Sequence, residues 1–151
     1  MVMVRRLGPD DLDRFRALNA LFADVFGEPE TYLGAPPSDE YARDLLADSS
    51  VILLAALEGE RVVGAIGGYR LRKFEQARSE IYIYDLAVAE DRRRRGIASA
   101  LIEETRRIAR DVGAWTVFVQ ADVFPEDEPA RALYRKLASD EITALHFDIA
   151  P

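Results

Sequence analysis

The feature that most constrains the fold is a strand-like run that leads through four arginines into a helix. Residues 80–88, EIYIYDLAV, are rich in β-branched and aromatic residues, as a central strand is. After Gly96, residues suited to a buried helix face recur every three to four positions until Gly113, namely Ile97, Leu101, Thr105, Ile108 and Val112. The pattern predicts a strand, a glycine-containing turn and an amphipathic helix in direct succession.

Shorter patterns on either side alternate between strand and helix, as expected for one domain over residues 1–151. Val2–Leu7 predicts a strand, and Gly8–Asp11 predicts a helix start with proline in the first turn and an end at Gly27. The prolines and glycine within Glu28–Pro37 predict a loop, and Ser38 an N-cap. The other predicted elements are a helix to Ala47, hairpin strands 51–57 and 61–69, a strand 115–121, a helix 129–137 and a final strand 142–149.

Composition excludes several kinds of chemistry. The chain has no cysteine and one histidine, which leaves no thiolate zinc site, cysteine nucleophile or multi-histidine metal centre. No apolar stretch reaches the ~18 residues that span a bilayer, and the first residues lack a secretory h-region, so we expect a cytoplasmic protein. The net charge of −7 argues against nucleic acid as a partner and fits either a cationic ligand or simple solubility.

The arginine-rich turn is a candidate phosphate site. Arg93, Arg94 and Arg95 directly precede Gly96 and Ile97–Ala98 at the predicted helix start. Backbone N–H groups and the helix dipole converge on an anion at such a turn, and glycine lets the anion approach closely. Positive charge at a helix N-terminus is unfavourable unless an anion offsets it, which favours phosphate over a solvated basic turn.

The pattern Arg93-x-x-Gly96-x-Ala98 after a strand resembles the pyrophosphate loop of the GNAT superfamily of N-acetyltransferases, R/Q-x-x-G-x-G/A. A second segment, Ala130–Leu137, is similar to the A-x-x-L-Y-x-K-L segment of that superfamily. The resemblance implies an α+β sandwich whose mixed, mostly antiparallel sheet is flanked by helices. It also implies that one strand splays from its neighbour at the acetyl-CoA site, and that acetyl-CoA is the co-substrate.

The same resemblance assigns residues to acetyl-CoA. It implies that the backbone of Leu86, Ala87 and Val88 pairs with the pantetheine arm, and that Tyr134 protonates the departing CoA thiolate. The residues it implies for cofactor binding are Leu86, Ala87, Val88, Arg93, Arg94, Arg95, Gly96, Ile97, Ala98, Asp127 and Ala130.

Four further stretches resemble one subfamily, the aminoglycoside 3-N-acetyltransferases, namely 73–76, 78–88, 119–122 and 146–149. This implies transfer of an acetyl group to the 3-amino group of an aminoglycoside, with antibiotic resistance as the outcome and a homodimer as the assembly. The loop 123–129 is longer than the family pattern, and Ala138 replaces a usual glycine. The range of accepted drugs therefore stays open.

A polycationic substrate needs carboxylates, and the candidates are Glu80, Asp85, Asp122, Asp127 and Asp148, with Glu126 and Glu128 at the rim. Asp85 is the preferred base, because an acid within an apolar strand requires a reason. Strict alternation puts Glu80 and Asp85 on opposite faces, so both reach one site only if a bulge intervenes. A lone His146 in a terminal strand is more often structural than catalytic.

Two alternatives stay open at this stage. One is a GNAT enzyme for another amine, such as a polyamine or a protein lysine. The other is a non-catalytic acetyl-CoA sensor, against which the joint presence of Asp85 and Tyr134 argues. A panel of amine substrates distinguishes an aminoglycoside enzyme from an enzyme for another amine. Acetyl-CoA binding without turnover on any amine would favour the sensor.

Overall fold

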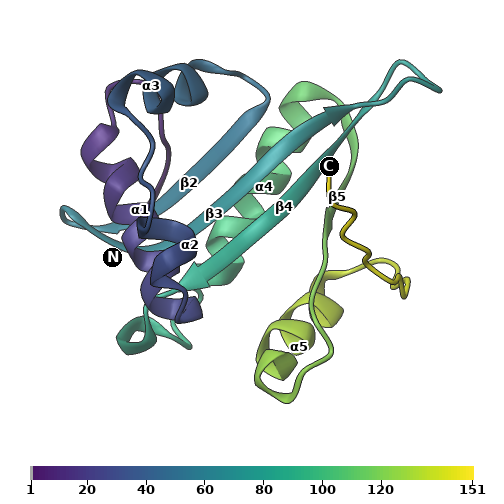
Figure 1. Cartoon of the computed structure of the whole chain (residues 1–151). Helices are drawn as coiled ribbons and strands as arrows, with labels where there is room; N and C mark the ends of the chain where they lie inside the picture. The colour runs from purple at the N-terminus through teal and green to yellow at the C-terminus, as the bar shows by residue number, and fades with distance from the viewer. Residues whose placement is uncertain (1) are drawn as a thin grey trace. The chain divides into compact units, whose positions relative to one another are not determined.

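The computed structural model describes residues 2–151, which divide into two compact units. The first unit ends at Phe118, and the second spans Val119–Pro151. Figure 1 labels the α-helices and the strands β2 to β5. Each unit is described by itself.

A mixed sheet forms the centre of the first unit. Within residues 2–151 its order is β1-β2-β3-β4-β5, with bounds Met3–Arg6, Val51–Glu58, Arg61–Arg72, Ser79–Val88 and Ala114–Val119. The pairings from β1 to β4 are antiparallel. A helical crossover joins β4 to β5, as the connection between parallel neighbours requires. The predicted α+β class, with a mostly antiparallel mixed sheet, is confirmed.

Helices cover both faces of this sheet, and Figure 1 shows α1 and α2 in front of it and α4 behind. Their bounds are α1 Leu12–Phe26, α2 Pro29–Leu33, α3 Asp39–Ala47 and α4 Ile97–Val112. Phe15, Leu18 and Phe22 bury one face of α1. Gly64 of β3 lets α4 approach closely, because a Cβ there would lie 2.7 Å from Ile97 Cγ2. This contact fixes the start of α4 against the sheet.

Local signals predicted several boundaries correctly and two only in part. Gly27 and Gly113 end α1 and α4 in the left-handed conformation, and Ser38 accepts a hydrogen bond from the N–H of Tyr41 at 3.1 Å. The expected helix start at Gly8–Asp11 is wrong only in part: Asp11 is the N-cap of α1, but Pro9 lies before the helix, in a turn where Asp11 Oδ2 accepts from the Gly8 N–H. The expected loop at 28–37 is wrong in part, because it contains α2.

A β-bulge interrupts the pairing of β3 with β4. Asp85 pairs with Gly67 and Ile83 with Gly68, so Tyr84 is the extra residue. Beyond the bulge the alternation is reversed, and Asp85 lies on the same face as Tyr82 and Glu80. A Cβ on Gly68 would lie 2.7 Å from the Tyr82 carbonyl oxygen, so glycine permits the close approach of the strands here. The bulge that would bring both acids to one face is confirmed.

The second unit contains a short 3-10 turn, Pro125–Asp127, followed by α5, Glu128–Leu137. Arg131 of α5 donates to the carbonyl oxygens of Asp122 and Phe124 and pairs with Glu128 at 2.7 Å. The predicted final strand at 142–149 is wrong, because these residues form no strand in the structure. Alternating apolar residues give a segment one apolar face, but a strand also needs a neighbouring strand to hydrogen-bond with.

Among residues 2–151, no helix combines the length and the apolar character needed to cross a bilayer.

Candidate active site

The arginine-rich loop is anchored to the sheet by its first arginine. Arg92 donates to both carboxylate oxygens of Glu58 at the end of β2, at 2.8 and 3.0 Å. Arg61 at the start of β3 pairs in the same bidentate way with Asp91, at 2.9 and 3.0 Å. Bidentate pairs of this kind fix geometry as well as charge. Arg92 is therefore a structural residue of the loop.

The next three arginines keep their charge uncompensated. Arg93 Nε makes one long contact to the Val88 carbonyl oxygen, at 3.4 Å. Within the part of the chain that the structure describes, no carboxylate pairs with Arg93, Arg94 or Arg95. Three neighbouring cations at the start of α4, with no acidic residue in its first turn, form a surplus of positive charge. An anionic ligand would offset it.

The backbone of this loop has the conformation of an anion site. Gly96 is the N-cap of α4 with φ +76°, and Arg94 has φ +62°, the one non-glycine residue between 2 and 151 with positive φ. A left-handed arginine is strained by about 1–2 kcal/mol. Turns with such residues direct successive N–H groups to one side, which binds anions. A Cβ on Gly96 would meet nothing within 4 Å, so the space beside it is open.

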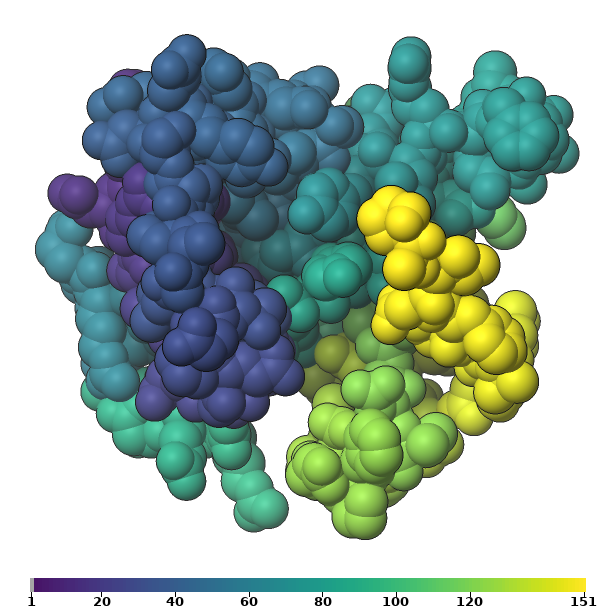
Figure 2. All heavy atoms as spheres, in the orientation of Figure 1, coloured from purple at the N-terminus to yellow at the C-terminus, as the bar shows by residue number. Residues whose placement is uncertain are grey.

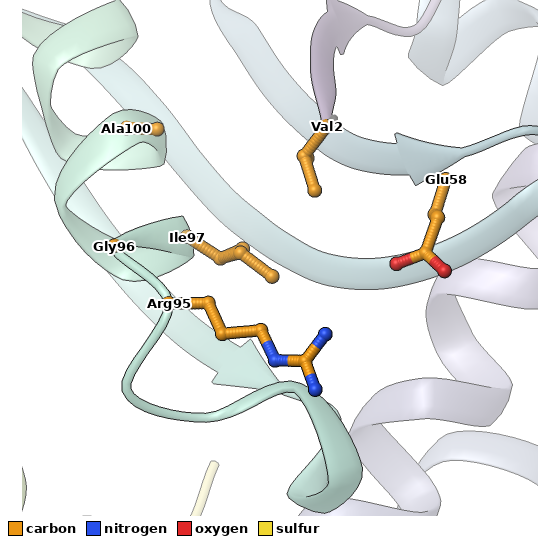
Figure 3. Close-up of a pocket in the computed structure, with 6 residues that line it drawn as sticks. All are labelled: Val2, Glu58, Arg95, Gly96, Ile97 and Ala100. Carbon is orange, nitrogen blue, oxygen red and sulfur yellow. The ribbon is translucent and has the colours of Figure 1, made fainter.

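A surface hollow of about 330 Å³ adjoins the loop. It is lined by Val2, Glu58, Arg95, Gly96, Ile97 and Ala100. Figure 3 shows the Arg95 side chain extending from the start of α4, with Glu58 of β2 across the hollow. The open main chain at Gly96, the helix start and guanidinium groups without a carboxylate partner in the described chain are features that bind a phosphate group, and binding of the acetyl-CoA diphosphate here stays a prediction.

Among the described residues, Asp85 is a negative charge without a positive partner, the reverse of the situation at the arginine loop. Its Oδ2 accepts a hydrogen bond of 2.9 Å from the Tyr32 hydroxyl, and no cation lies within ion-pair distance among residues 2–151. Burial raises the pKa of Asp85 above its usual value, the hydrogen bond from Tyr32 lowers it, and the charge of Glu28 raises it. The second carboxylate oxygen is left to accept a proton or bind an ammonium group.

Asp85 is exceptional among the acids of the first unit. The other four that are buried or partly buried each have a cation: Asp11 with Arg5 and Arg14, Glu58 with Arg92, Glu80 with Lys73, and Glu104 with Arg107. Burial of an acid without a positive partner costs free energy. Such a group is typical of sites where a charged ligand completes the pair.

Tyr32 was not predicted from the sequence. It lies on α2, within the segment expected to be a loop, and its ring packs beside Phe22 and Phe26 of α1 at centroid distances of 5.6 and 5.9 Å. This packing fixes the hydroxyl over Asp85. A signal existed, because Pro29 suits the first position of a helix as well as a loop. Figure 2 shows the blue atoms of α2 beside the teal atoms of β4.

Glu80 lies on the same face as Asp85 but is already neutralised. Lys73 Nζ lies 3.3 Å from Glu80 Oε1, and the Glu80 side chain is 17% exposed. The ion pair with Lys73 already occupies the Glu80 carboxylate, whereas Asp85 has no cation beside it among residues 2–151. The predicted catalytic role of Glu80 remains a prediction, and the geometry favours Asp85.

The remaining predicted cofactor residues of the first unit form the end of β4. Leu86, Ala87 and Val88 pair with Ile66, Ala65 and Gly64. Their other edge faces β5 in the strand order. Pairing of this backbone with a pantetheine arm, and the splaying of the strand, stay predictions.

The second unit holds the other predicted site residues, which are Asp122, Asp127, Ala130, Tyr134 and Asp148. Asp127 is the N-cap of α5, and the backbone oxygen of Tyr134 accepts from the Ala138 N–H at 2.7 Å. Asp148 pairs with His146 at 2.8 Å, and both side chains are exposed. The role of His146 is not decided by this exposed contact and stays a prediction. The roles of Asp122, Asp127, Ala130, Tyr134 and Asp148 stay predictions.

Comparison with known proteins defines the class. The family model described as "Acetyltransferase (GNAT) family" matches residues 15–138. The chain therefore belongs to the GNAT acetyltransferase family, whose acetyl donor is acetyl-CoA.

Solved structures similar to the chain include aminoglycoside acetyltransferases. One, from an uncultured soil metagenomic sample, is 50% identical with a TM-score of 0.97 over 100% of this chain and 99% of that chain. Another from such a sample, in complex with sisomicin, is 29% identical with a TM-score of 0.85 over 99% and 97%.

Curated relatives match over shorter lengths. An L-2,4-diaminobutyric acid acetyltransferase of Halalkalibacterium halodurans is 30% identical over 58% of this chain and 43% of its own length. N-acetyltransferase 8B of Rattus norvegicus is 30% identical over 54% and 36%. The chain thus spans less than half the length of these relatives.

Proposed function

We propose that this chain transfers an acetyl group from acetyl-CoA to the 3-amino group of an aminoglycoside, and that antibiotic resistance follows. The observation that carries the proposal is Asp85, a partly buried carboxylate without a cation among the described residues. A polycationic substrate supplies the missing charge. The 50% identity to an aminoglycoside acetyltransferase supports the same substrate class.

The residues divide the reaction between them. Arg93, Arg94, Arg95 and the N–H groups after Gly96 hold the acetyl-CoA diphosphate, and acetyl-CoA supplies the acetyl group as an activated thioester. Asp85, directly or through a water molecule, removes a proton from the substrate ammonium group. The freed amine attacks the thioester carbonyl carbon, the carbon–sulfur bond breaks, and the nitrogen gives its second proton to water to leave the neutral amide. Backbone N–H near Val88 steadies the oxyanion, and the Tyr134 hydroxyl gives its proton to the sulfur.

Tyr32 completes this assignment as a positioning residue. Its hydroxyl occupies one oxygen of Asp85 and leaves the other for the ammonium group. Burial and then the negative charge of Asp85 raise the pKa of Tyr32, so its hydroxyl keeps its proton and stays a donor.

We also propose that residues 1–151 act as one catalytic domain in the cytoplasm. The family match from residue 15 to residue 138 includes parts of both units and supports a single domain. A homodimer remains a prediction.

The test is thiol release from acetyl-CoA with gentamicin-type and kanamycin-type aminoglycosides, followed by locating the acetyl group by NMR. We expect turnover and a 3-N-acetyl product, together with a higher drug tolerance of cells that express the protein. Spermidine and a lysine peptide are run beside them. Turnover with these amines alone would support the alternative of another amine, and acetyl-CoA binding without turnover on any amine would support a sensor.

A further inference from the structure

Two exposed tyrosines form an aromatic surface on β3 and β4, next to Asp85. Tyr69 is 42% exposed and Tyr84 is 62% exposed. Their ring centroids lie 6.1 Å apart, and their planes meet at 84°. The two rings therefore form a corner, with apolar surface on two sides at nearly a right angle. We call Tyr69 and Tyr84 the tyrosine corner.

The tyrosine corner is supported from beneath. Tyr82 lies edge-on to Tyr84 at 5.6 Å, and Tyr82 itself stacks on Phe118 at 4.6 Å with planes 5° apart. Stacked and edge-on pairs of this kind hold rings in fixed orientations. A rigid aromatic surface binds a ligand with less loss of conformational entropy than a mobile one.

The same bulge contributes Tyr84 to the tyrosine corner and brings Asp85 to the face of the sheet that carries Tyr69. Tyr84 is the extra residue of β4, and Asp85 follows it. The register places Asp85, Tyr82 and Tyr69 on one face of the sheet. Burial is the first cause of the raised pKa of Tyr69 and of Tyr82, and the charge of Asp85 contributes to both. The rings thus lie within the field of that carboxylate and stay neutral at physiological pH.

A carboxylate beside two aromatic faces matches the chemistry of an amino sugar. Such a ring carries ammonium groups, which bind a carboxylate, and C–H bonds polarised by neighbouring ammonium groups, which pack on aromatic faces. A linear polyamine has the ammonium groups but no ring to fill a corner. The corner therefore favours a ring over a chain.

We propose that Tyr69 and Tyr84 are specificity-determining residues that hold the face of an amino-sugar ring whose ammonium group binds Asp85. This rests on the proposed function, because it names where the aminoglycoside lies. Tyr82 and Phe118 orient the corner and do not touch the substrate.

The test measures KM for a kanamycin-type aminoglycoside with the full chain and saturating acetyl-CoA. Tyr84→Ala and Tyr69→Ala should each raise this KM about 2- to 30-fold, the range for loss of one cation–aromatic contact. The values of kcat and of KM for acetyl-CoA should stay within about twofold. Tyr84→Phe should keep the wild-type KM, because it keeps the ring. Tyr84→Leu, which retains an apolar side chain, should behave like Tyr84→Ala.

Phe74→Ala is the matched control. Phe74 is fully exposed in the connection between the same two strands, so its loss should leave KM unchanged. Thermal unfolding of every variant shows whether the fold is intact, and Tyr84→Leu decides the question if Tyr84→Ala does not fold. An unchanged aminoglycoside KM in Tyr69→Ala and Tyr84→Leu overturns the tyrosine corner alone. A wild-type chain that acetylates no aminoglycoside overturns the proposed function first, and the corner with it.

Discussion

Two regions of the first unit hold charges without an ion-pair partner in the described chain, and their signs are opposite. The loop at Arg93–Arg95 has three cations and no acidic partner among residues 2–151, whereas Asp85 is a partly buried acid with no cation. Nearby, Arg92 by contrast is paired with two carboxylates, those of Glu58 and Asp91. The contrast indicates an anionic ligand at the loop and a cationic ligand at the strand, as a transfer from acetyl-CoA to an ammonium-bearing substrate requires.

The two regions also differ in how the backbone builds them. The loop depends on a left-handed glycine at its end and leaves its side chains in solvent. Asp85 depends on a bulge and on a hydrogen bond from a neighbouring helix. Each region can therefore be disrupted without the other, and the variants below do so.

Asp85→Asn should have the largest effect. It keeps the shape and an oxygen for Tyr32 but removes the charge that binds the ammonium group and accepts its proton, so kcat/KM for aminoglycosides should fall by about 10³ or more. Affinity for acetyl-CoA should not change. Glu80→Gln is the comparison, because Lys73 already neutralises Glu80. A larger loss in Glu80→Gln than in Asp85→Asn would move the base to Glu80.

Gly96→Asp should weaken acetyl-CoA binding by about 10²-fold, because it puts a carboxylate beside the diphosphate. Gly113→Asp is the matched control. Both glycines have positive φ, +76° and +68°, and open space where a Cβ would be, so backbone strain is similar in the two variants. Calorimetric titration with acetyl-CoA measures the difference. Equal affinities in the two folded variants would remove the loop from the donor site.

Alanine substitutions at two adjacent glycines opposite the bulge, Gly67 and Gly68, should differ in their effects on stability and activity. Gly68→Ala puts a Cβ 2.7 Å from the Tyr82 carbonyl oxygen, so the strands must shift, at a cost of about 1–3 kcal/mol of stability. Gly67→Ala meets Leu53 at 3.5 Å, an ordinary contact, and should be tolerated. Thermal unfolding and kcat/KM report both effects, and we expect a loss of about tenfold in activity for Gly68→Ala alone. Equal stability and equal kcat/KM in Gly68→Ala and Gly67→Ala would show that the position of Asp85 does not depend on the bulge.

Tyr32→Phe should have the smallest effect on rate, about fivefold, and a diagnostic effect on pH dependence. The Tyr32 hydrogen bond lowers the pKa of Asp85, while burial and Glu28 raise it. Removing the hydrogen bond therefore raises that pKa further, so the acid side of the kcat/KM profile should move to higher pH. A purely structural tyrosine would lower stability and leave the profile where it is.

Residue patterns predicted the strand and helix that hold the site residues better than they predicted the contacts that these residues make with distant parts of the chain. The strand at 80–88 and the helix after Gly96 follow from local periodicity. The positions of Glu80 and Asp85 showed only that a bulge is needed to bring both to one face, and the structure contains that bulge. The neutralisation of Arg92 by Glu58 joins residues 34 positions apart, which no local pattern reveals.

Tyr32 was missed and the final strand was wrong for a related reason. Proline at the start of α2 was interpreted as a breaker, although it also suits a first helical position. Residues 142–149 alternate as a strand does, yet Ile142, Phe147 and Ile149 are exposed and no strand forms. In both cases tertiary packing, which a single segment does not contain, decides the outcome.

The most direct test of the central claim is the pKa of the Asp85 carboxyl, measured by NMR on protein labelled with ¹³C at aspartate. The signal is assigned by its absence from Asp85→Asn. In the free protein the pKa should lie above the usual value for aspartate. With CoA and saturating aminoglycoside it should fall, because a nearby ammonium group stabilises the carboxylate. An Asp85 pKa that does not change when the aminoglycoside binds would contradict the account.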